Sequence, residues 1–176
     1  MRAIQFIMQF FRTMPWVEDF PEDKNRHINR YIFFYGTLRK AGTNYERVAS
    51  VPDIEYIGQF KTEDKYSFIG LKSGSFPYVT EHSFDNFDKV NVVGDLYEIK
   101  QNKEAFLQNI DQLEYKYSRK FVTINMNGKK ITSYIYLLTN TDMIRDVEPN
   151  ITPYGKQRFV YIESGDWIQW KSIKNV

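Results

Sequence analysis

The sequence contains no cysteine and only two histidines, His27 and His82, and these absences exclude several kinds of active site. Without cysteine the chain can form no disulfide, no thiolate nucleophile and no cysteine-ligated zinc site. Two histidines are too few for a multi-histidine metal site, and they leave few candidates for a Ser-His-Asp triad. Any catalytic site must therefore be built from other residue types.

An excess of charge of one sign and long apolar runs are also lacking. The 24 basic and 22 acidic residues are spread evenly, whereas a nucleic-acid-binding protein would show a clustered basic face. No apolar run is long enough to cross a bilayer. Residues 1–16 are apolar, but polar residues interrupt them and no small-residue cleavage site follows, so we expect no signal peptide. These features predict a soluble cytoplasmic protein that binds neither nucleic acid nor a membrane.

Aromatic residues, in contrast, are abundant, with 13 Tyr and 14 Phe in 176 residues. Such residues favour half-buried pleated surfaces, so the composition favours strands over a helical bundle. The length suits one domain with a hydrophobic core, which we place at residues 31–176 after an N-terminal extension at residues 1–30. Within the extension we expect an amphipathic helix at residues 1–16 that packs on the domain, followed by a polar linker. A helix that binds a membrane surface or a partner is the alternative.

The hydrophobic pattern of the domain predicts mostly strands and one strong helix. The helix covers residues 102–117, where Phe106, Ile110, Leu113 and Tyr117 recur on one face. Asn127-Gly128 tolerates positive φ at both turn positions, so the segments beside it are expected to pair as an antiparallel hairpin. The predicted strands are residues 31–35, 54–60, 66–71, 90–99, 121–126, 129–138 and 158–162. A turn at residues 164–167 follows the last strand.

Glu114 is the most informative polar residue. It lies four residues after Ile110 and seven after Leu107, so the helical period places it against the apolar stripe. Removal from water raises the pKa of a carboxyl group, as a general base or acid near pH 7 requires. The alternative is an edge residue that turns toward solvent or pairs with Arg119 or Lys116. The periodicity alone favours this alternative.

The segment Tyr35-Gly36-Thr37-Leu38 is a strand that ends abruptly in a glycine turn. Successive backbone N–H groups in such a turn can form a nest that binds a carboxylate or a developing oxyanion. A tight turn after a core strand is the simpler explanation of the same residues.

Taken together, the motifs of the chain resemble the γ-glutamylcyclotransferase-like superfamily. They run in the order Tyr35-Gly36-Thr37-Leu38, Gly74-x-Phe76-Pro77, Val92-x-Gly94-Asp95-Leu96-Tyr97-Glu98-Ile99, Ile110-Asp111-Gln112-Leu113-Glu114 and Tyr117-x-Arg119. The resemblance covers residues 31–138 and is closest to the branch of γ-glutamylamine cyclotransferases and avirulence-induced-gene-like proteins. Ser164-Gly165-Asp166-Trp167 resembles a terminal motif of some bacterial members.

The resemblance implies an α+β fold, with a small, mostly antiparallel, barrel-like sheet and flanking helices. It implies that the backbone of Tyr35, Gly36, Thr37 and Leu38 holds a γ-glutamyl group and that Glu114 is the catalytic acid and base. Tyr136 matches a tyrosine that lines the family's pocket, although an ordinary aromatic residue of the sheet would fit as well. Pro77 is expected to shape the pocket wall, and Gly94 and Trp167 to be structural.

The implied reaction is the intramolecular cyclisation of a small γ-glutamyl amine or amide, which releases 5-oxoproline and an amine. Orientation supplies much of the acceleration, so no cofactor, metal or covalent nucleophile is needed. Three features depart from the family: Tyr115 follows Glu114, where many members have Gly, Ala41 is an extra residue before Gly42, and residues 1–30 have no counterpart in compact members. The first two flank the side of the leaving group and leave its identity open. A binding protein of the same fold without turnover, and an interaction module that uses the N-terminal helix, are the competing interpretations.

Overall fold

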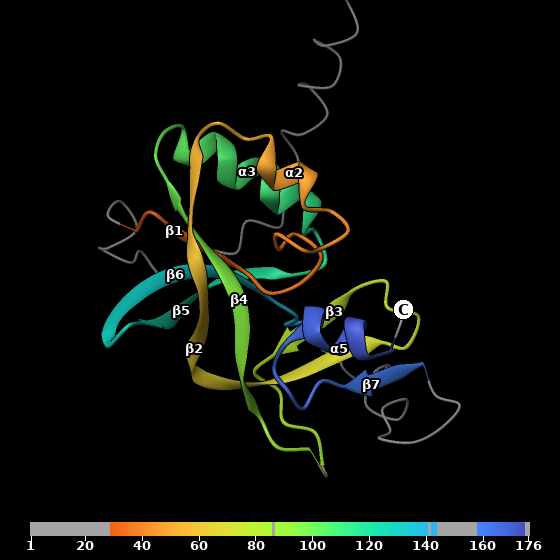
Figure 1. Ribbon diagram of the computed structural model, residues 1–176. Helices are drawn as coiled ribbons and strands as arrows, with labels where there is room; N and C mark the ends of the chain where they lie inside the picture. Colours follow the sequence, from red (N-terminus) through yellow and green to blue (C-terminus); the bar gives the residue numbers. More distant parts are fainter. Residues whose placement is uncertain (1–28, 86, 141, 144–157, 175–176) are drawn as a thin grey trace, which may run out of the picture.

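The computed structural model describes residues 29–85, 87–140, 142–143 and 158–174 (Figure 1). In chain order, the elements in these ranges are β1 (Tyr31–Phe34), α2 (Glu46–Ala49), β2 (Ile54–Leu71), β3 (Pro77–Thr80), β4 (Val90–Ile99), α3 (Lys103–Leu113), β5 (Ser118–Met126), β6 (Lys129–Leu137), β7 (Phe159–Tyr161) and α5 (Trp167–Lys174). The predicted N-terminal helix lies outside the described residues and stays a prediction.

Five strands close into a small barrel, in the order β2-β4-β1-β6-β5. Pairing of Lys61 with Asn125 and of Thr62 with Ile124 joins β5 back to β2 and completes the ring. The strands β1 and β6 are parallel, and the other neighbours pair antiparallel. In Figure 1, α2 and α3 lie together at one end of the barrel. The first residue of α5, Trp167, packs against Gly70 of β2. The predicted fold, a mostly antiparallel barrel-like sheet with flanking helices, is confirmed.

The strand β2 corrects one prediction, because residues 54–60 and 66–71 belong to one strand of 18 residues rather than two. The pairing register with β4 shifts between Lys61 and Lys65, which marks a bulge where the strand bends. Beyond the bend, β2 leaves the barrel and pairs with β3 and β7 on its two edges. The polar residues at the bulge broke the apolar pattern, but the backbone pairing continues through them.

The hairpin prediction is confirmed residue by residue. Asn127 and Gly128 have φ values of 52° and 89°, as a type I′ turn requires, and Met126 pairs with Lys129 across the turn. The first strand of the hairpin, β5, begins at Ser118, three residues earlier than predicted. The hairpin places Tyr136 next to β1, which pairs with β6 at Ile32 and Tyr134.

The barrel core contains aliphatic and aromatic side chains of the strands together with Trp167, which is fully buried. Trp167 opens α5, a helix at a position where the sequence predicted only a turn. The Asp166 carboxylate starts the helix, since its Oδ1 accepts hydrogen bonds from the backbone N–H groups of Ile168 (2.9 Å) and Gln169 (3.2 Å). A Cβ atom on Gly94 would lie 2.5 Å from the Phe33 ring, so β4 has no room for a side chain at this position.

Candidate active site

A cavity of about 60 Å³ lies where β1 ends. It is lined by Phe33, Phe34, Tyr35, Gly36, Thr37, Leu38, Phe76, Pro77, Glu114, Tyr117 and Tyr136. Every site residue predicted from the sequence is among them, although they come from four separate parts of the chain. The structure therefore places the predicted turn, the predicted carboxylate and the predicted wall residues around one pocket, which we call the inner pocket.

The turn after β1 is held by its own backbone and by Asn44. The N–H of Arg39 donates to the carbonyl of Gly36 (3.2 Å), and Asn44 donates to Thr37 through its backbone (2.9 Å) and its side chain (3.0 Å). In the part of the chain that the structure describes, no residue accepts a hydrogen bond from the N–H of Thr37 or Leu38. These two donors are therefore available to an anionic group in the inner pocket.

Close packing explains why the turn contains a glycine. A Cβ atom on Gly36 would lie 3.1 Å from Cγ of Pro77 and 3.2 Å from its Cδ. Both residues line the inner pocket, so a larger side chain at position 36 would push the turn and the pocket wall apart. The Gly36–Pro77 contact fixes the width of the pocket at this point.

The sequence predicted that the helix continues to residue 117 and contains Glu114. In the structure α3 ends at Leu113, and Glu114 is the next residue. Its backbone N–H still donates to the carbonyl of Ile110 (2.8 Å), so the helix delivers Glu114 to the pocket as its C-terminal cap. The described residues offer its carboxylate no hydrogen bond or ion pair. Burial raises the pKa of Glu114 from its ordinary value of 4.5 to about 7.

The alternative partners considered for Glu114 are engaged elsewhere. The guanidinium of Arg119 pairs with the carboxylate of Asp111 (3.1 Å), and the ammonium group of Lys116 lies 5.5 Å from the centroid of the Tyr115 ring. The half-buried Glu114 side chain therefore lines the pocket without a neutralising cation.

Three tyrosine hydroxyl groups surround the pocket, and each donates a hydrogen bond to a protein oxygen. The bonds are Tyr35 Oη to the carbonyl of Tyr136 (2.7 Å), Tyr117 Oη to the carbonyl of Pro77 (3.2 Å) and Tyr136 Oη to Oδ1 of Asp111 (2.6 Å). Burial, the largest cause, raises the pKa of all three tyrosines well above its usual value. They stay protonated near neutral pH, so Glu114 is the lining side chain that can exchange a proton there.

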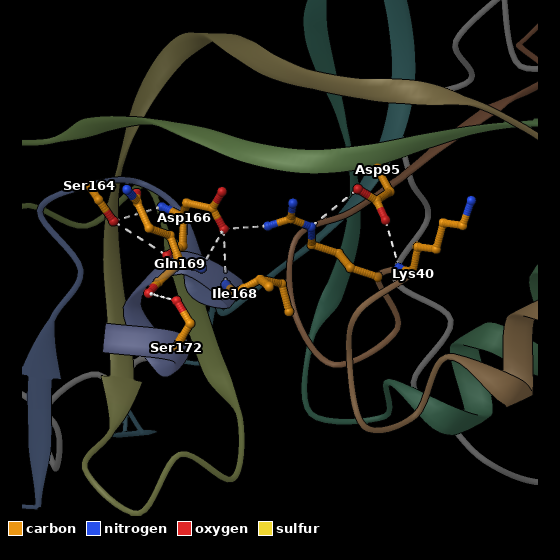
Figure 2. Close-up of polar contacts among 8 residues, drawn as sticks. Lys40, Asp95, Ser164, Asp166, Ile168, Gln169 and Ser172 are labelled. Atoms are coloured by element: carbon orange, nitrogen blue, oxygen red, sulfur yellow. Dashed lines mark hydrogen bonds and ion pairs between the residues drawn. The ribbon is translucent and has the colours of Figure 1, made fainter. Parts of the chain in front are cut away.

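The sequence did not predict an ion-pair bridge that holds the loop directly after the turn (Figure 2). Arg39 is only 2% exposed, and it contacts Asp95 of β4 through Nε (3.3 Å) and Asp166 through Nη1 (2.6 Å). The second oxygen of Asp95 accepts the backbone N–H of Lys40 (2.7 Å). The bridge ties the loop after Leu38 to a barrel strand and to the start of α5.

The sequence does contain a signal for this bridge, in the position of Asp95. Asp95 sits in the middle of β4 among apolar neighbours such as Val93 and Leu96, and a buried carboxylate needs a cationic or hydrogen-bonding partner. Arg39 directly follows the turn motif and is a candidate for the cationic partner of Asp95. Asp111 of the Ile110–Glu114 motif is likewise a supporting residue, since it is the partner of both Tyr136 and Arg119.

The described residues contain no cluster of three or more His, Asp or Glu side chains that could hold a metal ion. No helix in the described ranges is both long enough and apolar enough to span a membrane.

A family model for γ-glutamyl cyclotransferases of the AIG2-like type matches residues 32–169. The chain belongs to this family. The match covers the barrel, the inner pocket and the Arg39 bridge, so the γ-glutamylcyclotransferase-like enzyme assignment is confirmed together with the resemblance that predicted it.

Curated relatives of this cyclotransferase family include an archaeal and a vertebrate protein. A Methanocaldococcus jannaschii protein with the provisional name γ-glutamylcyclotransferase is 30% identical over 146 residues, which cover 80% of this chain and 98% of the relative. The γ-glutamylaminecyclotransferase A of Danio rerio is 24% identical over 116 residues, covering 63% of this chain and 70% of the relative.

Solved structures share the fold of this cyclotransferase chain at lower identity. An uncharacterised Pyrococcus horikoshii protein superposes with a TM-score of 0.55 and 18% identity, covering 84% of this chain and 97% of that protein. A mouse AIG2-like protein superposes with a TM-score of 0.51 and 17% identity, covering 62% and 77% respectively.

Proposed function

We propose that this protein converts a small γ-glutamyl amine or amide into 5-oxoproline and a free amine, with Glu114 as the proton shuttle. The observation that carries the proposal is the unpartnered Glu114 carboxyl, whose pKa of about 7 allows it to act as a base and then as an acid near neutral pH. It lines the same pocket as the free N–H groups of Thr37 and Leu38.

The lining of the inner pocket suits a γ-glutamyl group, because it combines unpaired backbone N–H donors with the Glu114 carboxyl. The N–H groups of Thr37 and Leu38 would bind an anionic oxygen of the substrate or of the transition state. The tyrosine hydroxyl groups, already bonded to protein oxygens, would hold the pocket walls rigid.

The proposed steps balance without a cofactor. Glu114 accepts a proton from the substrate's α-ammonium group, and the freed amine attacks its own γ-carbonyl carbon. A C–N bond forms in a five-membered ring, the original γ-amide C–N bond breaks, and Glu114 returns its proton to the departing nitrogen. The ring nitrogen loses its second proton to water, and the released amine takes one up. Holding the chain in the cyclic conformation supplies much of the acceleration.

The substitution Glu114→Gln tests the shuttle, because glutamine keeps the size and polarity of the side chain but cannot titrate. We expect 5-oxoproline release to fall by at least about 100-fold while KM changes little. Glu104→Gln is the matched control, since Glu104 lies exposed in the first turn of the same helix. In the wild type, kcat/KM should rise as the pH passes through about 7, because Glu114 must be ionised to accept the proton.

A Gln variant with full turnover would show that another group moves the proton. If neither protein turns over any member of a γ-glutamyl amine panel, a non-catalytic binding protein of the same fold becomes the better interpretation. Binding of a γ-glutamyl compound without product release would support that interpretation directly.

A further inference from the structure

A hollow of about 700 Å³ lies at the end of the barrel where α2 and α3 meet (Figure 1), and we call it the helix groove. It shares no lining residue with the inner pocket, so it is not part of the candidate active site. Phe106 and Ile110, each 4% exposed, are its most deeply buried lining residues, and the half-buried Val51 and Leu113 add apolar surface. A concave, partly apolar surface fits the rounded face of an amphipathic helix better than it fits a flat membrane.

The face of α3 that borders the groove is uncharged although it is exposed. It is formed by side chains spaced three, four and three residues apart, namely Asn102, Ala105, Asn109 and Gln112. The solvated face of a helix ordinarily carries charged residues, whereas depletion of charge is typical of surfaces that contact another protein segment. This face of α3 therefore has the character of a contact surface.

The described part of the chain begins beside the groove. Asn29 is only 8% exposed, and the carbonyl of Arg30 accepts the backbone N–H of Ile99 (2.6 Å). The next N–H along, that of Lys100, donates to the carbonyl of Asp53 (2.7 Å), and Asp53 lines the groove. The segment that precedes Asn29 therefore joins the domain within a few residues of the edge of the groove.

Residues 1–16 have the pattern and the reach to occupy the groove. Their polar residues repeat at the same spacing of three, four and three, which leaves the rest of the helical surface apolar: Arg2, Gln5, Gln9 and Arg12. Residues 17–28 span up to roughly 40 Å when extended, at about 3.3–3.6 Å per residue. The 11 residues of α3 measure only about 16 Å along the helix axis, so every part of the groove is within reach.

We propose that residues 1–16 form a helix whose apolar face docks in the helix groove of the same chain. The docked helix would lie along the uncharged face of α3, with its polar side toward solvent. It would also cover Leu113 and so brace the C-terminal end of α3. This contact is independent of the proposed reaction, and its test does not use turnover.

Photo-crosslinking of the full chain in dilute solution tests the position of the segment. Phe11 lies opposite the polar residues on a helical wheel, and Gln9 lies among them. With p-benzoylphenylalanine in place of Phe11, we expect crosslinks within one chain to peptides that contain residues 46–53 or 102–113. The same group in place of Gln9 is the matched control and should give few such crosslinks. Crosslinks of the Phe11 variant to another part of the domain, to a second copy of the chain or to added lipid vesicles would each overturn the proposal.

A substitution in the groove provides a second, independent readout. Trypsin cleaves after Arg12, and docking should protect this bond. Ala105→Asp should speed this cleavage at least about tenfold, because an unpaired carboxylate in the contact disfavours docking. Gln108→Asp introduces the same residue at an exposed position of α3 outside the groove, and it should leave the rate unchanged. Equal cleavage rates in the wild type and in Ala105→Asp would overturn the proposal.

Discussion

Glu114 should destabilise the folded protein at neutral and alkaline pH. Burial raises its pKa in the folded state from 4.5 to about 7, whereas the unfolded chain keeps a value near 4.5. The folded state therefore binds the proton more tightly, and this contribution to stability is complete below pH 4.5 and is lost as the pH rises through 7. At about 1.36 kcal/mol per pH unit, the interval between the two pKa values corresponds to at most roughly 3 kcal/mol.

The variant Glu114→Gln removes the titration, since its side chain is uncharged at every pH. Compared with the wild type, we expect it to be more stable at pH 8, by up to roughly 3 kcal/mol, and to have lost this advantage at pH 4.5. Urea unfolding followed by tryptophan fluorescence at several pH values measures the difference in the free energy of unfolding. Other titrating groups are common to both proteins and cancel in this difference.

The Glu104→Gln variant provides the control, since it replaces an exposed carboxylate of the same helix outside the pocket. The reasoning about Glu114 would be refuted by a Gln variant whose stability differs from the wild type by the same amount at pH 5 and pH 8. Such a result would mean that water solvates the Glu114 carboxylate in the folded state, and the proton-shuttle proposal would lose its physical basis.

Four further perturbations test other parts of the structure. Arg39→Met should lower the free energy of unfolding by about 3–5 kcal/mol because it leaves two carboxylates without their shared cation, and an unchanged urea midpoint would contradict this. Gly165→Ala should lower the melting temperature clearly, since φ is +69° and the added Cβ would lie 2.2 Å from a backbone oxygen. Gly128→Ala, at φ +89° with nothing within 4 Å, should cost less. Deleting residues 1–16 should lower the melting temperature if the predicted helix packs on the domain, at roughly 1.5–3 kcal/mol per buried large side chain. Unchanged stability with loss of vesicle or partner binding would favour the alternative.

The sequence predicted best those features that short-range chemistry determines. Asn127-Gly128 dictates a tight hairpin because of its backbone preferences alone, and the structure has that hairpin. Periodicity identified α3 and its buried side. It predicted a helix that continues to residue 117, whereas α3 ends at Leu113. Periodicity placed Glu114 beside the apolar stripe, but its position at a pocket was expected only from the family resemblance, and its geometry is that of a cap.

The features that the sequence did not predict depend on contacts between distant segments. The continuity of β2 across its bulge is a matter of backbone pairing with β4, which side-chain patterns do not report. The helix α5 depends on the Asp166 cap and on the burial of Trp167 in the barrel core, and the neighbouring sequence alone predicts neither. Arg39 looks like any surface cation until the fold brings two carboxylates to it.

The Arg39 bridge also has a consequence for biosynthesis. Arg39 and Asp166 are separated by 127 positions, so their ion pair closes a very long loop and can form only after Asp166 has left the ribosome. Contacts of such sequence separation form slowly, and translation delivers the N-terminal part of a domain first. The five barrel strands can thus assemble while the loop after β1 still lacks the ion pair between Arg39 and Asp166. A nascent chain would acquire the turn at residues 35–38 in its final form as one of the last events of folding, after the barrel around the inner pocket has closed.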